Sequence, residues 1–204
     1  MKIINVEQGS EEWHDYRKGK ISGTMLGELY SKRGNRKIGF YQMIADRLAI
    51  DPDDENRMDR GLRLEEEAIE LFEKQYKKKV ERVGISVHDK YPKIINSPDG
   101  LIKNGSKYTE AVEVKCLSPA RHIQAVVENS VPNEFEAQML QYFIVNPDLQ
   151  TLYFVFYDPR IVTVPLHIVE VHRTDRLQVL VDKYLAFQLD QIKEIDEIVE
   201  RLAF

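Results

Sequence analysis

The sequence contains one cysteine, Cys116, among 204 residues. A single thiol cannot form an intramolecular disulfide, and no cluster of cysteine and histidine has the spacing of a zinc site. No apolar stretch is long enough to span a bilayer, and residues 1–10 lack the apolar centre of a secretory signal. These absences predict a protein of the reducing cytoplasm.

Internal repeats, low-complexity segments and a recognisable linker are also lacking, so we expect one domain over residues 1–204. Hydrophobic residues make up 43% and charged residues 31%, as in globular proteins. The formal net charge of −5 argues against general binding to polyanions. Basic residues nevertheless cluster at 17–20, 32–37 and 77–79. Nucleic acid therefore remains a possible partner, held at a defined place.

The stretch Ser97–Cys116 carries the clearest functional signal. A Ser-Pro-Asp-Gly turn presents Asp99, and a strand follows over 109–116. Because side chains alternate along a strand, Glu113 and Lys115 share its polar face. Two carboxylates and an ammonium group can hold a divalent ion and activate water. The alternative is a solvated Glu-x-Lys ion pair of little energetic value.

Two predicted helices carry polar residues on apolar faces. Glu65 shares the stripe of Leu62, Ile69, Phe72 and Tyr76, where a buried carboxylate needs a partner or a metal. The alternative places Glu65 at the solvated end of the stripe, near Gly61.

Gln138 occupies the equivalent position in the helix that follows Pro132. It shares a face with Phe135, Tyr142 and Val145, and Gln141 lies at the edge of that face. A buried amide needs hydrogen-bond partners, which a metal-bound water, the lysine or simply the backbone would provide.

The remaining chain predicts alternating helices and strands. Helices are expected near 10–20, 24–30, 40–50, 62–76, 119–128, 132–145 and 174–202, and strands near 80–88, 93–97, 100–103, 109–116, 150–157 and 164–172. The first four strands predict a mostly antiparallel meander, with a hairpin signal at Asn104-Gly105. The apolar strand 150–157 is expected in the centre of the sheet.

Near the N-terminus, Arg17 lies beside the predicted start of the second helix at Thr24. Free amide groups at such a start attract anions, so the two residues predict a phosphate pocket. Ordinary helix capping with a surface arginine explains the same residues.

Together these motifs resemble the phage lambda exonuclease family, alkaline exonucleases of viral recombination with a PD-(D/E)xK nuclease motif. The resemblance spans most of the chain and rests on Glu7-Gln8-Gly9, Trp13-His14, Arg17, Gly19, Ile21, Thr24, Gly61 to Glu65, Leu71-Phe72-Glu73, Ser97 to Leu101, Glu113 to Cys116, Arg121, Ala137-Gln138, Gln141-Tyr142 and Tyr157-Asp158-Pro159-Arg160.

The resemblance implies an α/β (α+β) restriction-endonuclease-like core, with a central mixed sheet flanked by helices. Asp99, Glu113 and the Val114 carbonyl would hold Mg²⁺ or Mn²⁺, with Glu65 completing the site for a second ion. Lys115 would position or deprotonate the attacking water, and Gln138 would orient the site.

Substrate contacts and partners are implied as well. Arg17, Thr24, Ser97 and Arg121 would bind a terminal 5′-phosphate; the family has serine where this chain has Thr24. Met58 would be a wedge in DNA, with Arg33 or Arg36 in the minor groove. A ring-shaped homotrimer, a single-strand annealing partner and a phage or prophage gene in a bacterial host complete the expectation.

The sequence therefore predicts a Mg²⁺-dependent exonuclease that degrades the 5′-ended strand of duplex DNA. It would release mononucleotides and leave a 3′ single strand. The alternatives are a structure- or sequence-specific endonuclease on the same core and a non-catalytic module that binds DNA ends.

Overall fold

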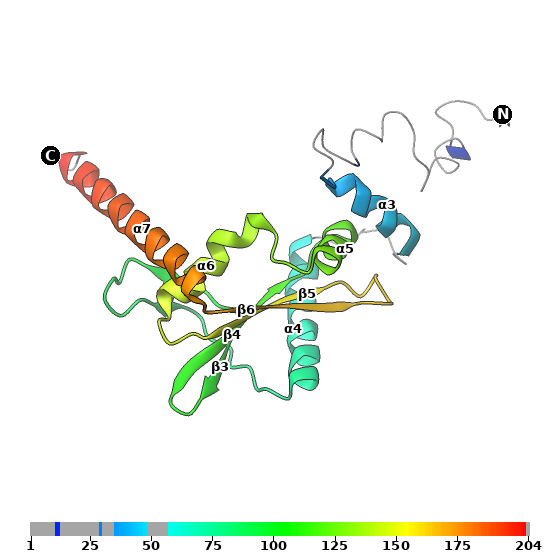
Figure 1. Ribbon diagram of the computed structural model, residues 1–204, viewed down its shortest axis with the longest axis horizontal. Helices are drawn as coiled ribbons and strands as arrows, with labels where there is room; N and C mark the ends of the chain where they lie inside the picture. The colour runs from blue at the N-terminus through cyan, green and yellow to red at the C-terminus, as the bar shows by residue number, and fades with distance from the viewer. Residues whose placement is uncertain (1–10, 13–28, 30–34, 49–56, 203–204) are drawn as a thin grey trace. The chain divides into compact units, whose positions relative to one another are not determined.

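The computed structural model describes residues 11–12, 29, 35–48 and 57–202 (Figure 1). Its helices are α3 (Ile38–Leu48), α4 (Arg57–Tyr76), α5 (Pro119–Glu128), the short 3₁₀ helix η1 (Asn133–Phe135), α6 (Glu136–Val145) and α7 (Asp175–Leu202). Its strands are β1 (Ser86–Val87), β2 (Ile95–Asn96), β3 (Gly100–Asn104), β4 (Lys107–Lys115), β5 (Thr151–Tyr157) and β6 (Leu166–His172). Of the helices predicted near 10–20 and 24–30, only residues 11–12 and 29 are described, and these are helical. Among the described helices, none is long and apolar enough to cross a membrane.

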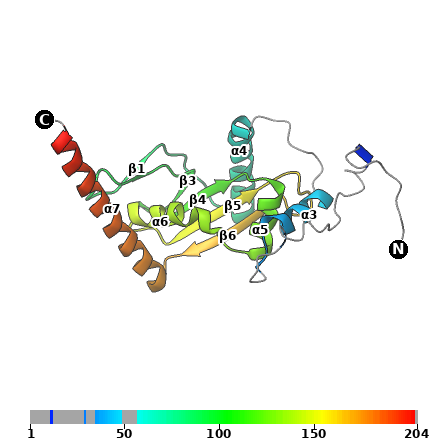
Figure 2. The same ribbon diagram turned by 90° about the horizontal axis from the view of Figure 1, so that it is seen from above.

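Four strands form one sheet with the order β3-β4-β5-β6, in which β5 is an inner strand, as predicted (Figure 2). β3 and β4 pair antiparallel around Gly105, whose φ of 63° suits glycine. Gln150, just before β5, donates to the carbonyl of Thr109 near the start of β4. β4 and β5 therefore start at the same edge, and α5 and α6 lie in the connection between them, as a parallel crossover requires. The mixed α/β architecture is confirmed.

The strand predicted over 80–88 is wrong in most of its length. Glu81 makes one antiparallel bridge with Leu101, and only Ser86–Val87 forms a strand, which pairs with β2 in a separate two-stranded sheet. Gly100 explains the close approach there, because a Cβ on it would lie 2.1 Å from Cγ1 of Val80. The single meander expected over 80–116 is therefore two hairpins in two sheets.

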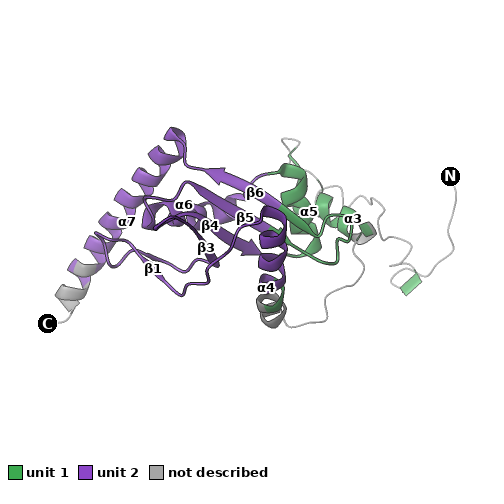
Figure 3. Cartoon of the chain, turned by 90° about the horizontal axis from the view of Figure 1, so that it is seen from below, with its two compact units in different colours: residues 1–64, 116–129, 156–167 green, residues 65–115, 130–155, 168–204 purple. Residues whose placement is uncertain are grey.

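The described residues divide into two compact units, coloured separately in Figure 3. Unit 2 comprises residues 65–115, 130–155 and 168–204, and unit 1 comprises residues 1–64, 116–129 and 156–167. The expectation of one domain stays a prediction.

The core of unit 2 contains two residues of the predicted apolar stripe of α4, Ile69 and Phe72. Ala68, which the predicted stripe did not include, is fully buried beside them, and Phe72 stacks on Tyr76 with ring centroids 4.8 Å apart. In the same unit, α6 packs against α7. α7 starts where predicted, because the hydroxyl of Thr174 accepts from the Leu177 amide at 3.2 Å.

In unit 1, α3 packs against α5 around a small core of Tyr41, Ala45, Ala120, Ile123 and Ile161. Pro119 occupies the first turn of α5, as predicted. The predicted turn at 157–160 contains a buried ion pair, in which Arg160 donates to both carboxylate oxygens of Asp158 at 2.8 Å. This turn therefore has a structural role in the unit.

Candidate active site

The register of the β3–β4 hairpin brings two predicted metal ligands together. Gly100 pairs with Val112, so Asp99, just before β3, comes opposite Glu113. Val114 donates its amide to Oδ2 of Asp99 at 2.7 Å. The second oxygen, Oδ1, accepts no hydrogen bond from any described residue. One carboxylate oxygen is thus fixed by the hairpin, and the other is available to a ligand.

Glu113 is only 1% exposed, although it lies on the polar face of β4. Lys115 and Gln138 both donate to its Oε1, and the hydroxyl of Tyr142 donates to its Oε2. The alternative of a solvated ion pair is wrong, because both faces of the strand are covered at this point. A buried carboxylate is costly unless it is paired in this way.

Lys115 completes the group of polar residues at the end of β4. Its side chain is 18% exposed, and Nζ lies 5.1 Å from the centroid of the Phe135 ring. The ring and the carboxylate hold the ammonium group beside Glu113, so it points toward the two acids and away from bulk water.

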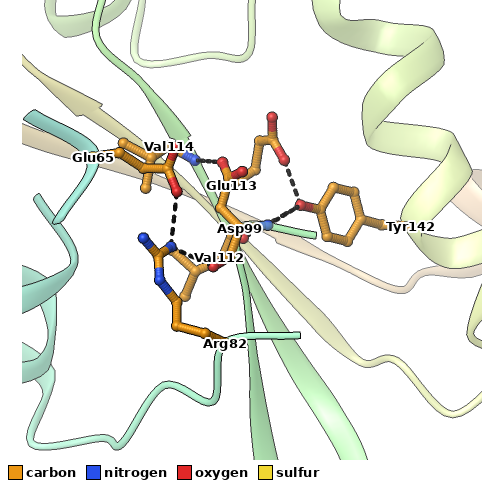
Figure 4. A network of polar contacts seen from close by, with 7 residues as sticks. All are labelled: Glu65, Arg82, Asp99, Val112, Glu113, Val114 and Tyr142. Atoms are coloured by element: carbon orange, nitrogen blue, oxygen red, sulfur yellow. Dashed lines mark hydrogen bonds and ion pairs between the residues drawn. The ribbon is translucent and has the colours of Figure 1, made fainter. Parts of the chain in front are cut away.

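Glu65 approaches the same site from α4, and Arg82 connects it to Asp99 (Figure 4). Nη1 of Arg82 donates to Oε1 of Glu65 at 2.8 Å and to the main-chain carbonyl of Asp99 at 2.6 Å. The predicted carboxylate on the apolar stripe is thus paired with an arginine at the partly exposed edge of the site.

The clustering of acids alters the proton affinity of Asp99. Burial and the negative charges of Glu113 and Glu65 raise the pKa of Asp99 to about 7, although the Val114 amide and Lys115 oppose this rise. A carboxylate so destabilised in its charged form favours a bound cation. The site therefore has the electrostatics of a cation site.

Comparison with known proteins gives this arrangement a context. The model of the YqaJ-like viral recombinase domain matches residues 12–148. The chain belongs to this family. The crystal structure of an alkaline exonuclease, LHK-Exo from Laribacter hongkongensis, superposes with a TM-score of 0.62 at 24% identity, covering 95% of this chain and 98% of that one. The structure of LHK-Exo in complex with dAMP gives 0.61 at 25% identity with the same coverage. The comparison with curated proteins found no match.

Two residues of the site in this recombinase-family chain, Tyr142 and Arg82, are not among the predicted site residues. The sequence predicts Tyr142 on an apolar stripe, yet its hydroxyl donates to Glu113 and accepts from the Asp99 amide at 3.3 Å. Its spacing of four from Gln138 was the available signal, because a buried phenol needs a polar partner. Arg82 gave no such signal, since its partners lie far away in the sequence.

The tyrosine remains a donor at all ordinary pH values. Burial and the negative charge of Glu113 raise the pKa of Tyr142 far above its usual value. Because its hydroxyl lies between Asp99 and Glu113, Tyr142 positions both acids. The Val112 carbonyl lies 3.3 Å from the same hydroxyl oxygen (Figure 4).

The predicted phosphate-binding residues are only partly described. Ser97 is exposed in unit 2, whereas Arg121 belongs to α5 in unit 1 and donates to Gln124 at 3.0 Å. Arg17 and Thr24 lie outside the described residues. The pocket therefore stays a prediction.

The residues that are predicted to contact DNA are also only partly described. Met58 lies in the first turn of α4, but its side chain is outside the described part, as is all of Arg33. The guanidinium of Arg36 lies 4.8 Å from the centroid of the Phe40 ring. Gln141 donates to the carbonyl of Ile95 at 2.8 Å, away from the acids.

The donor chemistry fits Mg²⁺ or Mn²⁺ with few protein ligands. Within the described ranges, no three histidine, cysteine, aspartate or glutamate side chains lie close enough to hold one ion between them. Mg²⁺ commonly takes one or two carboxylates and completes its shell with water and substrate oxygens. Asp99 and Glu113 match that pattern. Val114 and Glu65 as ligands stay predictions.

Proposed function

We propose that the chain is a Mg²⁺-dependent exonuclease that hydrolyses the 5′-ended strand of duplex DNA. One observation carries the proposal: the hairpin register of a recombinase-family chain sets Asp99 beside Glu113, with Lys115 and Gln138 on the same carboxylate. A decayed site would be expected to have lost at least one of these groups.

The residues divide the work of phosphodiester hydrolysis. Asp99 and Glu113, with the Val114 carbonyl, would hold the ion, and Glu65 would support a second one. Bound there, the ion would polarise the scissile phosphate and lower the pKa of water. Lys115 donates from its ammonium group, which suits it to hold the attacking water or a phosphate oxygen. Gln138 and Tyr142 keep the Glu113 carboxylate oriented.

DNA as substrate draws on the relative that was crystallised with dAMP. In our proposal a 5′-phosphate on the strand end is bound by Arg17, Thr24, Ser97 and Arg121, which keeps the enzyme at that end. Successive release of mononucleotides leaves a 3′ single strand for a single-strand annealing protein. A homotrimer around the duplex is part of the same proposal, and light scattering that gives a monomer at micromolar concentration would contradict it.

The test is digestion of linear duplex DNA labelled at one 5′ end, in Mg²⁺. Wild type is compared with Lys115→Ala and with Lys90→Ala, which removes an exposed lysine outside the site. We expect mononucleotides from 5′-phosphorylated ends, little from 5′-hydroxyl ends, and a loss of at least 100-fold only in Lys115→Ala, as for loss of a general acid or base, roughly 10²–10⁴-fold.

Two other outcomes favour the alternatives. Cleavage of covalently closed circular duplex would indicate an endonuclease, because an exonuclease leaves such circles intact. Binding to DNA ends without cleavage in either Mg²⁺ or Mn²⁺ would indicate a module that only binds ends.

A further inference from the structure

A second feature of unit 2 is a basic hollow that the proposed catalytic site does not use. It encloses about 360 Å³ where the end of α4 meets the outer edge of β3. Four lysines line it, together with two glutamates: Lys77, Lys78, Lys79, Lys103, Glu81 and Glu110. We refer to it as the lysine hollow.

Local backbone geometry gathers these lysines. α4 ends at Tyr76, and Lys77 takes a left-handed conformation with φ of 54°, which turns the chain away from the helix axis. The sequence then continues directly through Lys78 and Lys79. Lys103 comes from β3, which has only β4 and the single bridge at Leu101 as described partners. Three consecutive lysines thus line the same hollow as a fourth lysine on the edge strand β3.

Only part of this positive charge is neutralised by the protein. Lys78 donates to Glu110 and to the hydroxyl of Tyr153. Glu81 accepts from the hydroxyl of Tyr108 at 2.5 Å, and Lys103 lies 5.2 Å from the centroid of that ring. Lys77 and Lys79 are exposed and form no ion pair with a described residue.

We propose that the lysine hollow binds the phosphodiester backbone of a single nucleic-acid strand. Lysines act as point charges for phosphates, and those of the hollow come from two elements that meet at one place. Because the net charge of the chain is −5, this positive surface is confined to one place, as expected for a nucleic acid that is bound at a defined position. The candidate active site of this recombinase-family chain lies on the same helix, α4, which favours a nucleic acid over an acidic peptide as the occupant.

The lysine hollow and the candidate active site lie at two places along the same helix, α4. Glu65 and Tyr76 are eleven residues apart on α4, about 16 Å along the axis. One strand can therefore lie along this helix from the acids to the lysines. The inference rests on the proposed function for the identity of the polymer as DNA, and its charge argument is independent of catalysis.

The test measures binding without cleavage. Fluorescence anisotropy follows a labelled 20-nucleotide oligothymidylate in EDTA, across a series of NaCl concentrations. Lys77→Gln/Lys79→Gln/Lys103→Gln is compared with wild type and with Lys90→Gln/Lys183→Gln/Lys193→Gln, which removes three exposed lysines elsewhere. Both variants change the net charge equally, so a difference in their DNA binding depends on where the replaced lysines lie. Circular dichroism and thermal melting check that both are folded.

The expected result is a weaker salt dependence in the hollow variant alone. Each phosphate contact on a single strand contributes roughly 0.7 to the slope of log K against log salt, so three lost contacts lower it by about 2. We expect affinity near 0.1 M salt to fall about tenfold. Equal slopes in the hollow variant and wild type would overturn the proposal.

Competitors identify the source of the phosphate. Excess tripolyphosphate that displaces the oligonucleotide no better than sulfate supports a strand site, and complete displacement by stoichiometric tripolyphosphate identifies a free-phosphate site instead. Polyglutamate that competes as well as oligothymidylate of equal charge would assign the surface to an acidic protein and overturn the proposal. Since EDTA stops metal-dependent cleavage, a failed nuclease proposal leaves this readout intact.

Discussion

The guanidinium of Arg82 donates to Glu65 at 2.8 Å, from a side chain that is 46% exposed. The same nitrogen reaches the carbonyl of Asp99. A cationic group of the protein therefore joins the Glu65 carboxylate to the backbone of Asp99, where the proposed second ion would lie. Arg82 orients Glu65, and its positive charge would oppose such an ion.

We expect Arg82→Gln to bind divalent ions more tightly. Removing a positive charge next to Glu65 and Asp99 favours a cation there, by about threefold after discounting for solvent screening. Calorimetric titration with Mg²⁺ measures the change, and Arg176→Gln on α7 is the matched control. Weaker binding in Arg82→Gln would show that orientation of Glu65 matters more than repulsion.

Tyr142→Phe tests the positioning of the two acids. The change leaves the Asp99 amide and Oε2 of Glu113 without their partner in a buried place, which costs about 1–3 kcal/mol. Urea unfolding in EDTA measures the free energy of unfolding. Tyr184→Phe, whose hydroxyl donates to Glu136 at 3.5 Å in an exposed place, should change it by less than about 0.5 kcal/mol. Equal effects of the two changes would contradict the role of Tyr142.

Much of the fold follows from local chemistry that is visible in the sequence. The 3.6-residue period of α4, the glycine at 105 and the cap at Thr174 each depend on neighbours within a few positions, and each predicted element is present. Asp99 and Glu113 were also predictable as a pair, because a hairpin between them brings both ends of the loop together.

The predictions that were wrong concern residues whose structure depends on partners far away in the sequence. Residues 80–85 have strand composition, but packing of Val80 on Gly100 and the bridge at Glu81 replace a regular ladder. Burial of Glu113 likewise depends on α6 covering the polar face of β4. Alternation along a strand shows which residues share a face, and only the tertiary structure decides what covers it.

The raised pKa of Asp99 predicts how pH acts on the metal-free protein. Its value of about 7 lies above 3.8, so between these pH values the folded state binds more protons than the unfolded state. Stability from this group is therefore lost as pH rises through that window, by at most about 4 kcal/mol. Asp99→Asn keeps an acceptor for Val114 and cannot ionise.

We expect wild type to lose stability relative to Asp99→Asn between pH 4.5 and 7.5, measured by urea unfolding in EDTA. Exposed Asp89→Asn should follow wild type throughout. With Mg²⁺ present the trend should reverse, because the ion stabilises the ionised carboxylate. If the free energies of unfolding of wild type and Asp99→Asn change in parallel with pH in EDTA, the pKa of Asp99 is not raised in the folded protein.

A second pH effect is expected from His122, which is fully buried in unit 1. Since a carbonyl only accepts, Nε2 carries the proton and donates to Val164 at 2.7 Å. Nδ1 is buried and has no partner among the described residues. Burial lowers the pKa of His122 below 6.5; Arg160 adds to this, against the opposing effects of the Val164 carbonyl and Asp158.

Protonation would place an N–H at Nδ1 where no described group accepts it. The unfolded state therefore binds more protons below about pH 6.5, and stability is lost as pH falls from 7 to 5, by at most about 1.4 kcal/mol per pH unit. His122→Gln can still donate to Val164 without titrating, so its urea unfolding curve should lack this slope. Exposed His172→Gln is the control. If His122→Gln keeps the wild-type slope, the acid sensitivity arises elsewhere, and His167, with its own unpaired buried Nε2, is the next group to change.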